Sequence, residues 1–290
     1  MLRIVSFNIW NVWRLTRRAW NRDDLAAEVL TELRPDIFCL QEFDGPFREE
    51  HPGLIELMPD WREVPVPGVA PADNWNPIFY SASRFRHKAG GHHVYTAGTE
   101  YPYREKYRSH FRTLTWGVLE ELTSGRLLAV VNTHYDTDAA NHRSESDELL
   151  AVCSRLVGEY GCPVLVTGDY NCPPGGVAVQ NMLSHGFRDT CALAERPAGV
   201  HGCHPYPILN EKKQIFDRYD DRFYHTDYAD AIDHVLLLGD ARVLEYRTVI
   251  NEKTLLVSDH SPVLVVMEEP VLRSCSHADT MVTENKKENT

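Results

Sequence analysis

Short apolar runs recur along the whole chain, and they constrain its fold more than any other feature. They are rich in Val, Ile, Leu and Phe, as buried strands are. These runs cover residues 2–7, 36–40, 77–80, 127–131, 164–166, 232–238 and 262–267. A further segment, 112–119, alternates, with Leu114, Trp116 and Val118 on one face, as in a half-buried strand. The sequence therefore predicts a protein built mainly around β-sheets.

Two segments with helical spacing lie between these strands. In 24–33, Leu25, Val29 and Leu33 follow one another at intervals of four, and 144–160 has a similar apolar face followed by Gly161 as a stop signal. Strands outnumber helices, and each half of the chain has one helix between strand pairs. This order favours an α/β (α+β) fold: a four-layer αββα sandwich, with two mixed β-sheets packed face to face and helices outside.

The predicted domain organisation is a single catalytic domain over residues 1–270. Segments 66–77 and 196–230 are rich in Pro, Asp, Tyr and His and are predicted to be long loops, which in compact domains are often functional. Residues 271–290 are polar and are predicted to form a disordered C-terminal tail.

Composition narrows the class of protein. Of 290 residues, 43% are hydrophobic and 25% charged, as in a globular protein that buries a core. No apolar stretch approaches the roughly 20 residues that span a bilayer, and the N-terminus does not resemble a signal peptide. The seven cysteines are scattered without a CxxC pair, which argues against a zinc site or a disulfide framework. We therefore expect reduced, buried cysteines and a cytoplasmic location, and no obligatory protein partner is evident.

The net charge of −12 argues against general binding to duplex nucleic acid, where cationic surface supplies most of the affinity. The charge is uneven, however. Residues 1–22 hold five arginines and no acid, and residues 84–112 hold seven basic residues and two acidic ones. Both segments combine arginine with aromatic rings, which suits a phosphate that carries a base, a single-stranded end or another ring. A packed helix with a solvated basic face explains the same pattern for about half of these residues.

Polar residues stand at the ends of the predicted strands, although each alone is explained by a turn, a cap or a structural histidine. Asp169 and Asn171 follow VLVTG and face the same way if the strand continues past its end. The other members of the set are Asn8, Glu42, His134, Asp233, Asp259 and His260. In stacked sheets such ends gather at one edge, so we expect oxygen and nitrogen ligands from distant segments to converge there.

The motifs SFNIW, LQE, NTHYD, GDYN, IDHV and SDHSPV, taken in this order, resemble those of the endonuclease/exonuclease/phosphatase family. The resemblance runs from Ser6 to Val263. Each motif is weak alone, but six in order at plausible spacings are a strong signal. The family's fold is the same four-layer sandwich. Its members hydrolyse phosphodiesters or phosphomonoesters with a divalent metal, which implies Mg²⁺ or Mn²⁺ here.

The resemblance also implies a role for each residue. Glu42, Asn8 and Asp259 would form the metal site, and Asp169 would orient or deprotonate the attacking water. Asn171 and His134 would donate to the phosphate, while Asp233 would fix the ring of His260 and favour its protonated form. Arg112, which adjoins the strand of His134, is predicted to reach the phosphate, and His204 in the 201–228 loop to contact the substrate.

The predicted function is in-line attack of activated water on phosphorus, without a covalent enzyme intermediate. The substrate is expected to be a nucleic acid end, a nucleotide or another small phosphorylated molecule. A sphingomyelinase- or inositol-phosphatase-like hydrolase is an alternative, although we identify neither a secretion signal nor the basic loops that such enzymes need. A non-catalytic phosphate-binding or regulatory protein on the same fold is the alternative from another class. A pseudoenzyme is expected to lose an essential group, and here none is missing.

Overall fold

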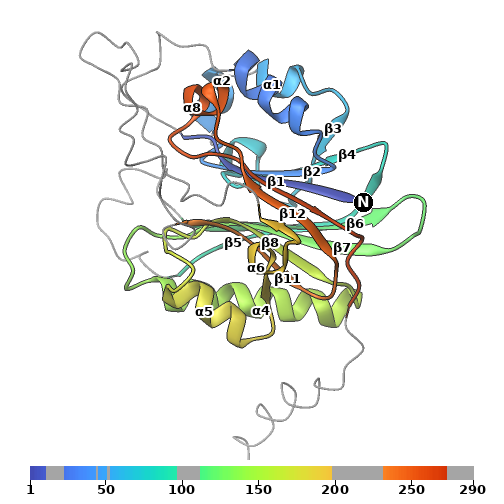
Figure 1. The fold of residues 1–290 in the computed structure, drawn as a ribbon, viewed down its shortest axis with the longest axis vertical. Helices are drawn as coiled ribbons and strands as arrows, with labels where there is room; N and C mark the ends of the chain where they lie inside the picture. Colours follow the sequence, from blue (N-terminus) through green and yellow to red (C-terminus); the bar gives the residue numbers. More distant parts are fainter. Residues whose placement is uncertain (11–22, 44, 51–52, 97–111, 198–230, 273–290) are drawn as a thin grey trace, which may run out of the picture.

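A computed structural model describes the chain apart from residues 11–22, 44, 51–52, 97–111, 198–230 and 273–290 (Figure 1). The described residues form two mixed β-sheets that lie face to face. The strands of the seven-stranded sheet, in spatial order, are β10 (Arg196–Pro197), β12 (Val243–Thr248), β13 (Val263–Met267), β1 (Leu2–Asn8), β2 (Ile37–Gln41), β4 (Ile78–Ser81) and β3 (Trp61–Glu63). Those of the six-stranded sheet are β5 (Phe85–Val94), β6 (Thr113–Glu121), β7 (Leu127–His134), β8 (Val164–Asp169), β11 (Asp233–Leu238) and β9 (Arg188–Asp189).

Helices cover the outer faces of both sheets, so the four-layer αββα sandwich is confirmed (Figure 1). On the seven-stranded sheet lie α1 (Asp23–Leu33), α2 (Gly45–Glu50) and α8 (Glu252–Val257). The short helix α3 (Gly53–Glu56) belongs to the same layer, because its Leu54 lies in the same buried cluster as Val5, Phe38 and Leu30. On the six-stranded sheet lie α4 (His142–Tyr160) and α5 (Val177–Ser184). The described residues also contain two short helices, η1 (Pro71–Asp73) and α6 (Thr190–Leu193). No described helix combines the length and apolar composition that a membrane crossing requires.

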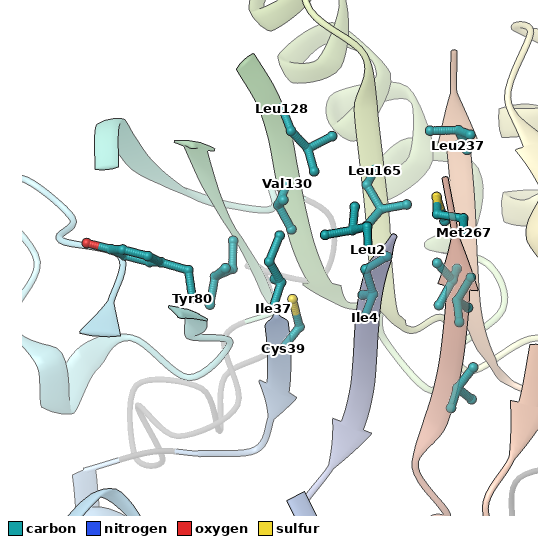
Figure 2. Close-up of a cluster of buried hydrophobic side chains, with 14 of the residues drawn as sticks. Leu2, Ile4, Ile37, Cys39, Tyr80, Leu128, Val130, Leu165, Leu237 and Met267 are labelled. Carbon is teal, nitrogen blue, oxygen red and sulfur yellow. The ribbon is translucent and has the colours of Figure 1, made fainter. Parts of the chain in front are cut away.

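The hydrophobic core follows the layers. One buried cluster contains side chains from the inner faces of both sheets, including Leu2, Ile37, Val130 and Leu165 (Figure 2). A second lies between the seven-stranded sheet and its helices, and a third between the six-stranded sheet and α4 and α5. Because these strands are buried on both faces, their sequences contain continuous apolar runs rather than alternating apolar and polar residues.

All the predicted strands and both predicted helices are present, with boundaries shifted by a few residues. Sequence inspection missed β5 and β12, the longest of the other strands. β5 contains charged residues, histidines and Gly90–Gly91, and most of its side chains are only half-buried, because it forms an edge of its sheet. β12 is also half-buried at three of its six positions, Leu244, Glu245 and Arg247. The predicted loop 66–77 contains only the single turn of η1, and the 196–230 loop lies almost wholly outside the described residues.

The cysteines of the described chain are free and buried, as expected from the sequence: Cys39, Cys153, Cys162, Cys172 and Cys191. Burial raises the pKa of the Cys39 thiol to about 12, so this thiol stays protonated at neutral pH and acts as a small apolar side chain. No disulfide forms within the described part of the chain.

Candidate active site

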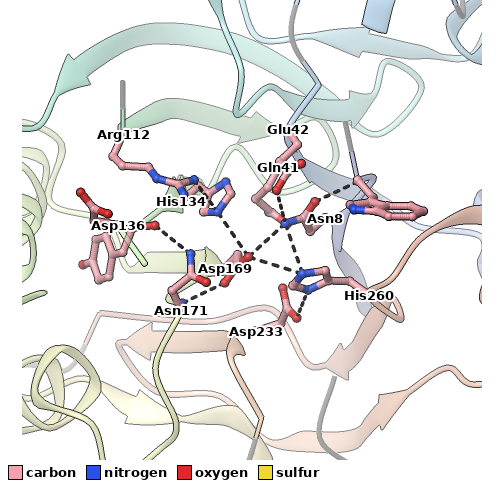
Figure 3. Close-up of polar contacts among 12 residues, drawn as sticks. Asn8, Gln41, Glu42, Arg112, His134, Asp136, Asp169, Asn171, Asp233 and His260 are labelled. Carbon is pink, nitrogen blue, oxygen red and sulfur yellow. Dashed lines mark hydrogen bonds and ion pairs between the residues drawn. The ribbon is translucent and has the colours of Figure 1, made fainter. Parts of the chain in front are cut away.

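The strand register brings three polar residues into one row across the six-stranded sheet. His134 at the end of β7 pairs with Asp169 at the end of β8, and Asp169 pairs with Asp233 at the start of β11. β11 runs antiparallel to β8, which is why a residue that opens a strand lies beside one that closes a strand. All three are nearly inaccessible to solvent. The row faces the seven-stranded sheet, from which Asn8 and Glu42 approach (Figure 3).

Gly168, the residue before Asp169, is required by the close approach of β7. Its φ is +152°, and a Cβ built there would lie 2.1 Å from the backbone oxygen of Thr133. Only glycine fits both constraints. The glycine of the GDYN motif therefore allows the ends of β7 and β8, with His134 and Asp169, to lie side by side.

Asp169 is at the centre of the site (Figure 3). Its Oδ2 accepts from Asn8 Nδ2 at 3.0 Å and lies 3.3 Å from His134 Nε2 and 3.7 Å from His260 Nε2. Its Oδ1 accepts the backbone N–H of Asn171 at 2.8 Å. Burial alone raises the pKa of Asp169, but the two histidines and these hydrogen bonds outweigh it and hold the pKa at about 2. Asp169 is therefore ionised at neutral pH.

His260 is held between two carboxylates. Its Nδ1 lies 2.8 Å from Asp233 Oδ2, and its Nε2 faces Asp169. Burial lowers the pKa of His260, but Asp233 and Asp169 raise it well above the ordinary histidine value. The ring is consequently a buried imidazolium. One ligand atom from each of Asp169, Asp233 and His260 lies within 4.8 Å of the others, so this buried group could also hold a metal ion.

Glu42 and Asp259 are two further carboxylates at the site, beside Asn8 and His260 respectively. Glu42 Oε1 accepts from Asn8 Nδ2 at 3.2 Å, so the Asn8 amide bridges Glu42 and Asp169. Asn8 Oδ1 accepts the backbone N–H of Trp10. Burial raises the pKa of Asp259 to about 7; His260 acts against this shift, and Glu42 and Asp169 act with it. Among the described residues, the site therefore has more carboxylates than positively charged groups that could neutralise them.

Arg112 lies beside His134 at the rim. The residue after it, Thr113, pairs with His134 in the sheet, and Arg112 Nη1 lies 2.6 Å from His134 Nε2. Burial and then the arginine charge lower the pKa of His134 to about 4. His134 is therefore neutral near pH 7 and accepts from Arg112 through Nε2. The charge that acts on Asp169 at this pH is accordingly that of His260.

Three residues at the site have strained backbones. Of the four non-glycine residues with positive φ in the described chain, Trp10 (58°), Glu42 (62°) and Asn171 (47°) lie here. Such conformations cost on the order of 1–3 kcal/mol each, and they persist where the surroundings impose them. Asn171 Nδ2 donates to the backbone oxygen of Tyr135 at 2.9 Å, which fixes the amide beside Asp169.

Two supporting features were missed from the sequence. Beneath the site, Gln41 Nε2 donates to Asn132 Oδ1 at 2.7 Å, and this buried amide pair joins the two sheets. Ser258 Oγ donates to the Asn8 backbone oxygen and accepts from the backbone N–H of His260, so it links two parts of the site. The amide pair could have been predicted from the sequence, because Asn132 is a polar residue inside an otherwise apolar strand.

The structure thus brings together most of the residues predicted from the sequence. Those that converge are Asn8, Glu42, Arg112, His134, Asp169, Asn171, Asp233, Asp259 and His260. His204 lies outside the described residues, as do most of the basic and aromatic residues of the two arginine-rich segments.

Comparison with known proteins gave one family. Residues 6–260 match the model of the endonuclease/exonuclease/phosphatase family. A comparison with curated proteins gave no match.

Solved structures resemble the whole fold at low sequence identity. An endonuclease/exonuclease/phosphatase from Bacteroides vulgatus is 19% identical, with 92% of this chain and 98% of that chain covered and a TM-score of 0.72. A mannosyl-6-phosphatase from Bacteroides thetaiotaomicron is 18% identical, with 93% and 100% covered and a TM-score of 0.71. TDP2 from D. rerio, complexed with a single-stranded DNA product, is 15% identical, with 92% and 99% covered and a TM-score of 0.63.

Proposed function

The chain belongs to the endonuclease/exonuclease/phosphatase family, and on that premise we propose that it is a divalent-metal-dependent phosphoesterase. Members of this family are hydrolases that act on phosphoester bonds. The observation that carries the proposal is the surroundings of Asp169: an ionised carboxylate lies between an imidazolium, a neutral imidazole and two amides, beside a second group of carboxylates. Such a set can bind a phosphate and activate water on the same spot.

The donor set fits a hard divalent cation. Mg²⁺ and Mn²⁺ prefer oxygen ligands, and one or two carboxylates suffice when water and substrate complete the shell. Glu42 and Asp259 would hold the ion. Burial, and after it the charges of Glu42 and Asp169, raises the pKa of Asp259, and a bound cation would favour its ionised form. Asn8 would join them through Oδ1 after its amide rotates, because its NH₂ group now faces the carboxylates. We favour this set over Asp169, Asp233 and His260, since a protonated imidazole is not a metal ligand.

When bound, the cation supplies positive charge that polarises the phosphoryl group and stabilises the transition state. Asp169 orients or deprotonates the attacking water, because its Oδ2 is the carboxylate oxygen that faces the centre of the site. Attack occurs in line on phosphorus, without a covalent enzyme intermediate.

Positive charge for the phosphate comes from His260 and Arg112. Asp233 keeps His260 protonated and fixes its ring, so that Nε2–H points into the site. Arg112 carries a planar guanidinium that suits a phosphate. When the guanidinium turns to the substrate, His134 is released to carry its proton on Nε2 and donate to a non-bridging oxygen, while Asn171 donates from the opposite side.

A small phosphorylated molecule, a nucleotide or a nucleic acid end is the substrate class that we favour. Arginine and aromatic residues lie together in the sequence next to Asn8 and before Arg112, which suits a phosphate attached to a ring. The similar structures include a sugar phosphatase and a protein complexed with single-stranded DNA. Cleavage of sphingomyelin or an inositol phosphate is the alternative, and Mg²⁺ or Mn²⁺ as the metal and a cytoplasmic location stay predictions.

Hydrolysis of bis-(p-nitrophenyl) phosphate with Mg²⁺ or Mn²⁺, with and without chelator, tests the proposal. Metal-dependent turnover that His260→Ala lowers by orders of magnitude, in a variant that remains folded, would support it. Phosphate binding without any metal-dependent turnover would favour the non-catalytic alternative. A panel of single-stranded DNA, RNA, duplex DNA, nucleotides, inositol phosphates and sphingomyelin then identifies the substrate class.

A further inference from the structure

Glu42 has a backbone conformation that it would not adopt unaided. Its φ of +62° is in the left-handed region, where side chains other than glycine are disfavoured. Its carboxylate nevertheless reaches Asn8 Nδ2 at 3.2 Å. Contacts with neighbouring residues must therefore hold the backbone in this turn. The contacts of the next residue, Phe43, do so.

Both the backbone and the side chain of Phe43 are fixed by contacts with neighbouring residues. Its side chain is fully buried, and its N–H donates to the backbone oxygen of Trp75 at 3.1 Å. Its backbone oxygen accepts from Nε of Arg48 in α2 at 3.2 Å. The guanidinium of the same arginine lies over the Phe43 ring, 4.5 Å from its centroid. Arg48 thus contacts both the backbone and the ring of the residue next to Glu42.

Arg48 is itself fixed by a bidentate ion pair with Glu63. Its Nη1 and Nη2 donate to the two carboxylate oxygens of Glu63 in β3, at 2.8 and 2.9 Å. Both side chains are mostly buried, with 16% and 22% of their surface exposed. Such a paired geometry needs the planar fork of arginine, which lysine lacks.

The network extends to the second sheet. Arg48 Nη2 also approaches the backbone oxygen of Asn74 at 3.4 Å, and Asn74 Nδ2 approaches Glu63 at the same distance. Thr115 in β6 donates to Asn74 Oδ1 at 2.6 Å. Arg48 therefore contacts the seven-stranded sheet directly through Glu63 and is linked to the six-stranded sheet only through Asn74. Among the interactions of the described residues it has no direct contact with the polar cluster around Asp169.

We propose that Arg48 is a positioning residue: through Phe43 and the ion pair with Glu63, it holds the Glu42 carboxylate where it binds a divalent cation. The inference rests on the proposed function, because it takes Glu42 as a metal ligand. Groups that orient a ligand in this way commonly change metal affinity by about 10- to 100-fold when removed.

Direct Mn²⁺ binding tests the proposal without using activity. The electron paramagnetic resonance signal of free Mn²⁺ gives the dissociation constant for the parent and each variant. Arg48→Met should weaken binding about tenfold or more. Arg48→Lys should not restore it, because lysine cannot contact Phe43 and both Glu63 oxygens together. Glu63→Gln should weaken it less, and excess Mn²⁺ should restore kcat in all three variants.

Arg155→Met is the matched control. Arg155 in α4 lies 4.8 Å from the ring centroid of Trp116 and pairs with Glu159, but it is on the outer face of the other sheet. A merely structural role for Arg48 would lower thermal stability and leave the Mn²⁺ dissociation constant unchanged.

Two results would overturn the inference in distinguishable ways. If Glu42→Gln abolishes Mn²⁺ binding while Arg48→Met and Glu63→Gln stay within twofold of the parent, the positioning role is wrong and the metal assignment stands. If Glu42→Gln also leaves binding unchanged, both are wrong. Should Arg48→Met not fold, Glu63→Gln decides.

Discussion

Replacing Gly168 with alanine should damage both the fold and the site. The added methyl group would lie 2.1 Å from the Thr133 backbone oxygen, more than 1 Å inside the 3.4 Å at which ordinary contact begins. The backbone must also keep a φ of +152°, which alanine disfavours. Strain of this kind costs about 1–3 kcal/mol, and overpacking a tight interior costs about another 1–3 kcal/mol.

We therefore expect Gly168→Ala to lower the free energy of unfolding by roughly 2–6 kcal/mol, measured by urea titration with circular dichroism. Gly175→Ala is the matched control, since a Cβ there meets nothing within 4 Å. Turnover by the folded fraction of Gly168→Ala should also fall, because relief of the clash moves His134 away from Asp169. A Gly168→Ala protein within about 0.5 kcal/mol of the parent, the range of ordinary surface substitutions, would refute the reasoning.

Two further predictions concern pH. Asp233→Asn removes a negative charge that raises the pKa of His260, so the alkaline limb of the kcat/KM profile should move to lower pH. An alkaline limb at the same pH as in the parent would contradict the role of Asp233 in keeping His260 protonated. Hydrogen bonds from Ser124 and Thr123 lower the pKa of Glu121 from 4.5 to about 2, so its stabilisation is present above pH 4.5 and is lost as the pH falls toward 2. The unfolding free energy of Glu121→Gln should accordingly fall less steeply with acid over this window, and parallel curves would count against it.

The buried strands could be predicted from the sequence because both their faces lie against other layers. β1, β8 and β13 are buried at almost every position, and each contains a run of consecutive apolar residues without the alternation that a solvent-exposed face produces. β5 could not be predicted in the same way. As an edge strand it buries few side chains, so its composition is set by solvent rather than by the core.

The site was foreseeable as a convergence of strand ends, but not in its geometry. Sequence position alone places Asp169 and Asn171 after a strand, whereas the row of His134, Asp169 and Asp233 depends on register across three strands. The contacts of Arg48 depend on a turn with a positive φ at Glu42, which is not a glycine and so gave no signal. Long-range pairing and strained turns are the parts that local pattern does not encode.

Turnover of bis-(p-nitrophenyl) phosphate by Asp169→Asn, at saturating Mn²⁺, tests the central claim most directly. Asparagine keeps the size of the side chain but removes the negative charge that we assign to water activation. The account predicts a folded protein whose kcat is lower by about 10²- to 10⁴-fold. A folded Asp169→Asn protein with the kcat of the parent would contradict the account.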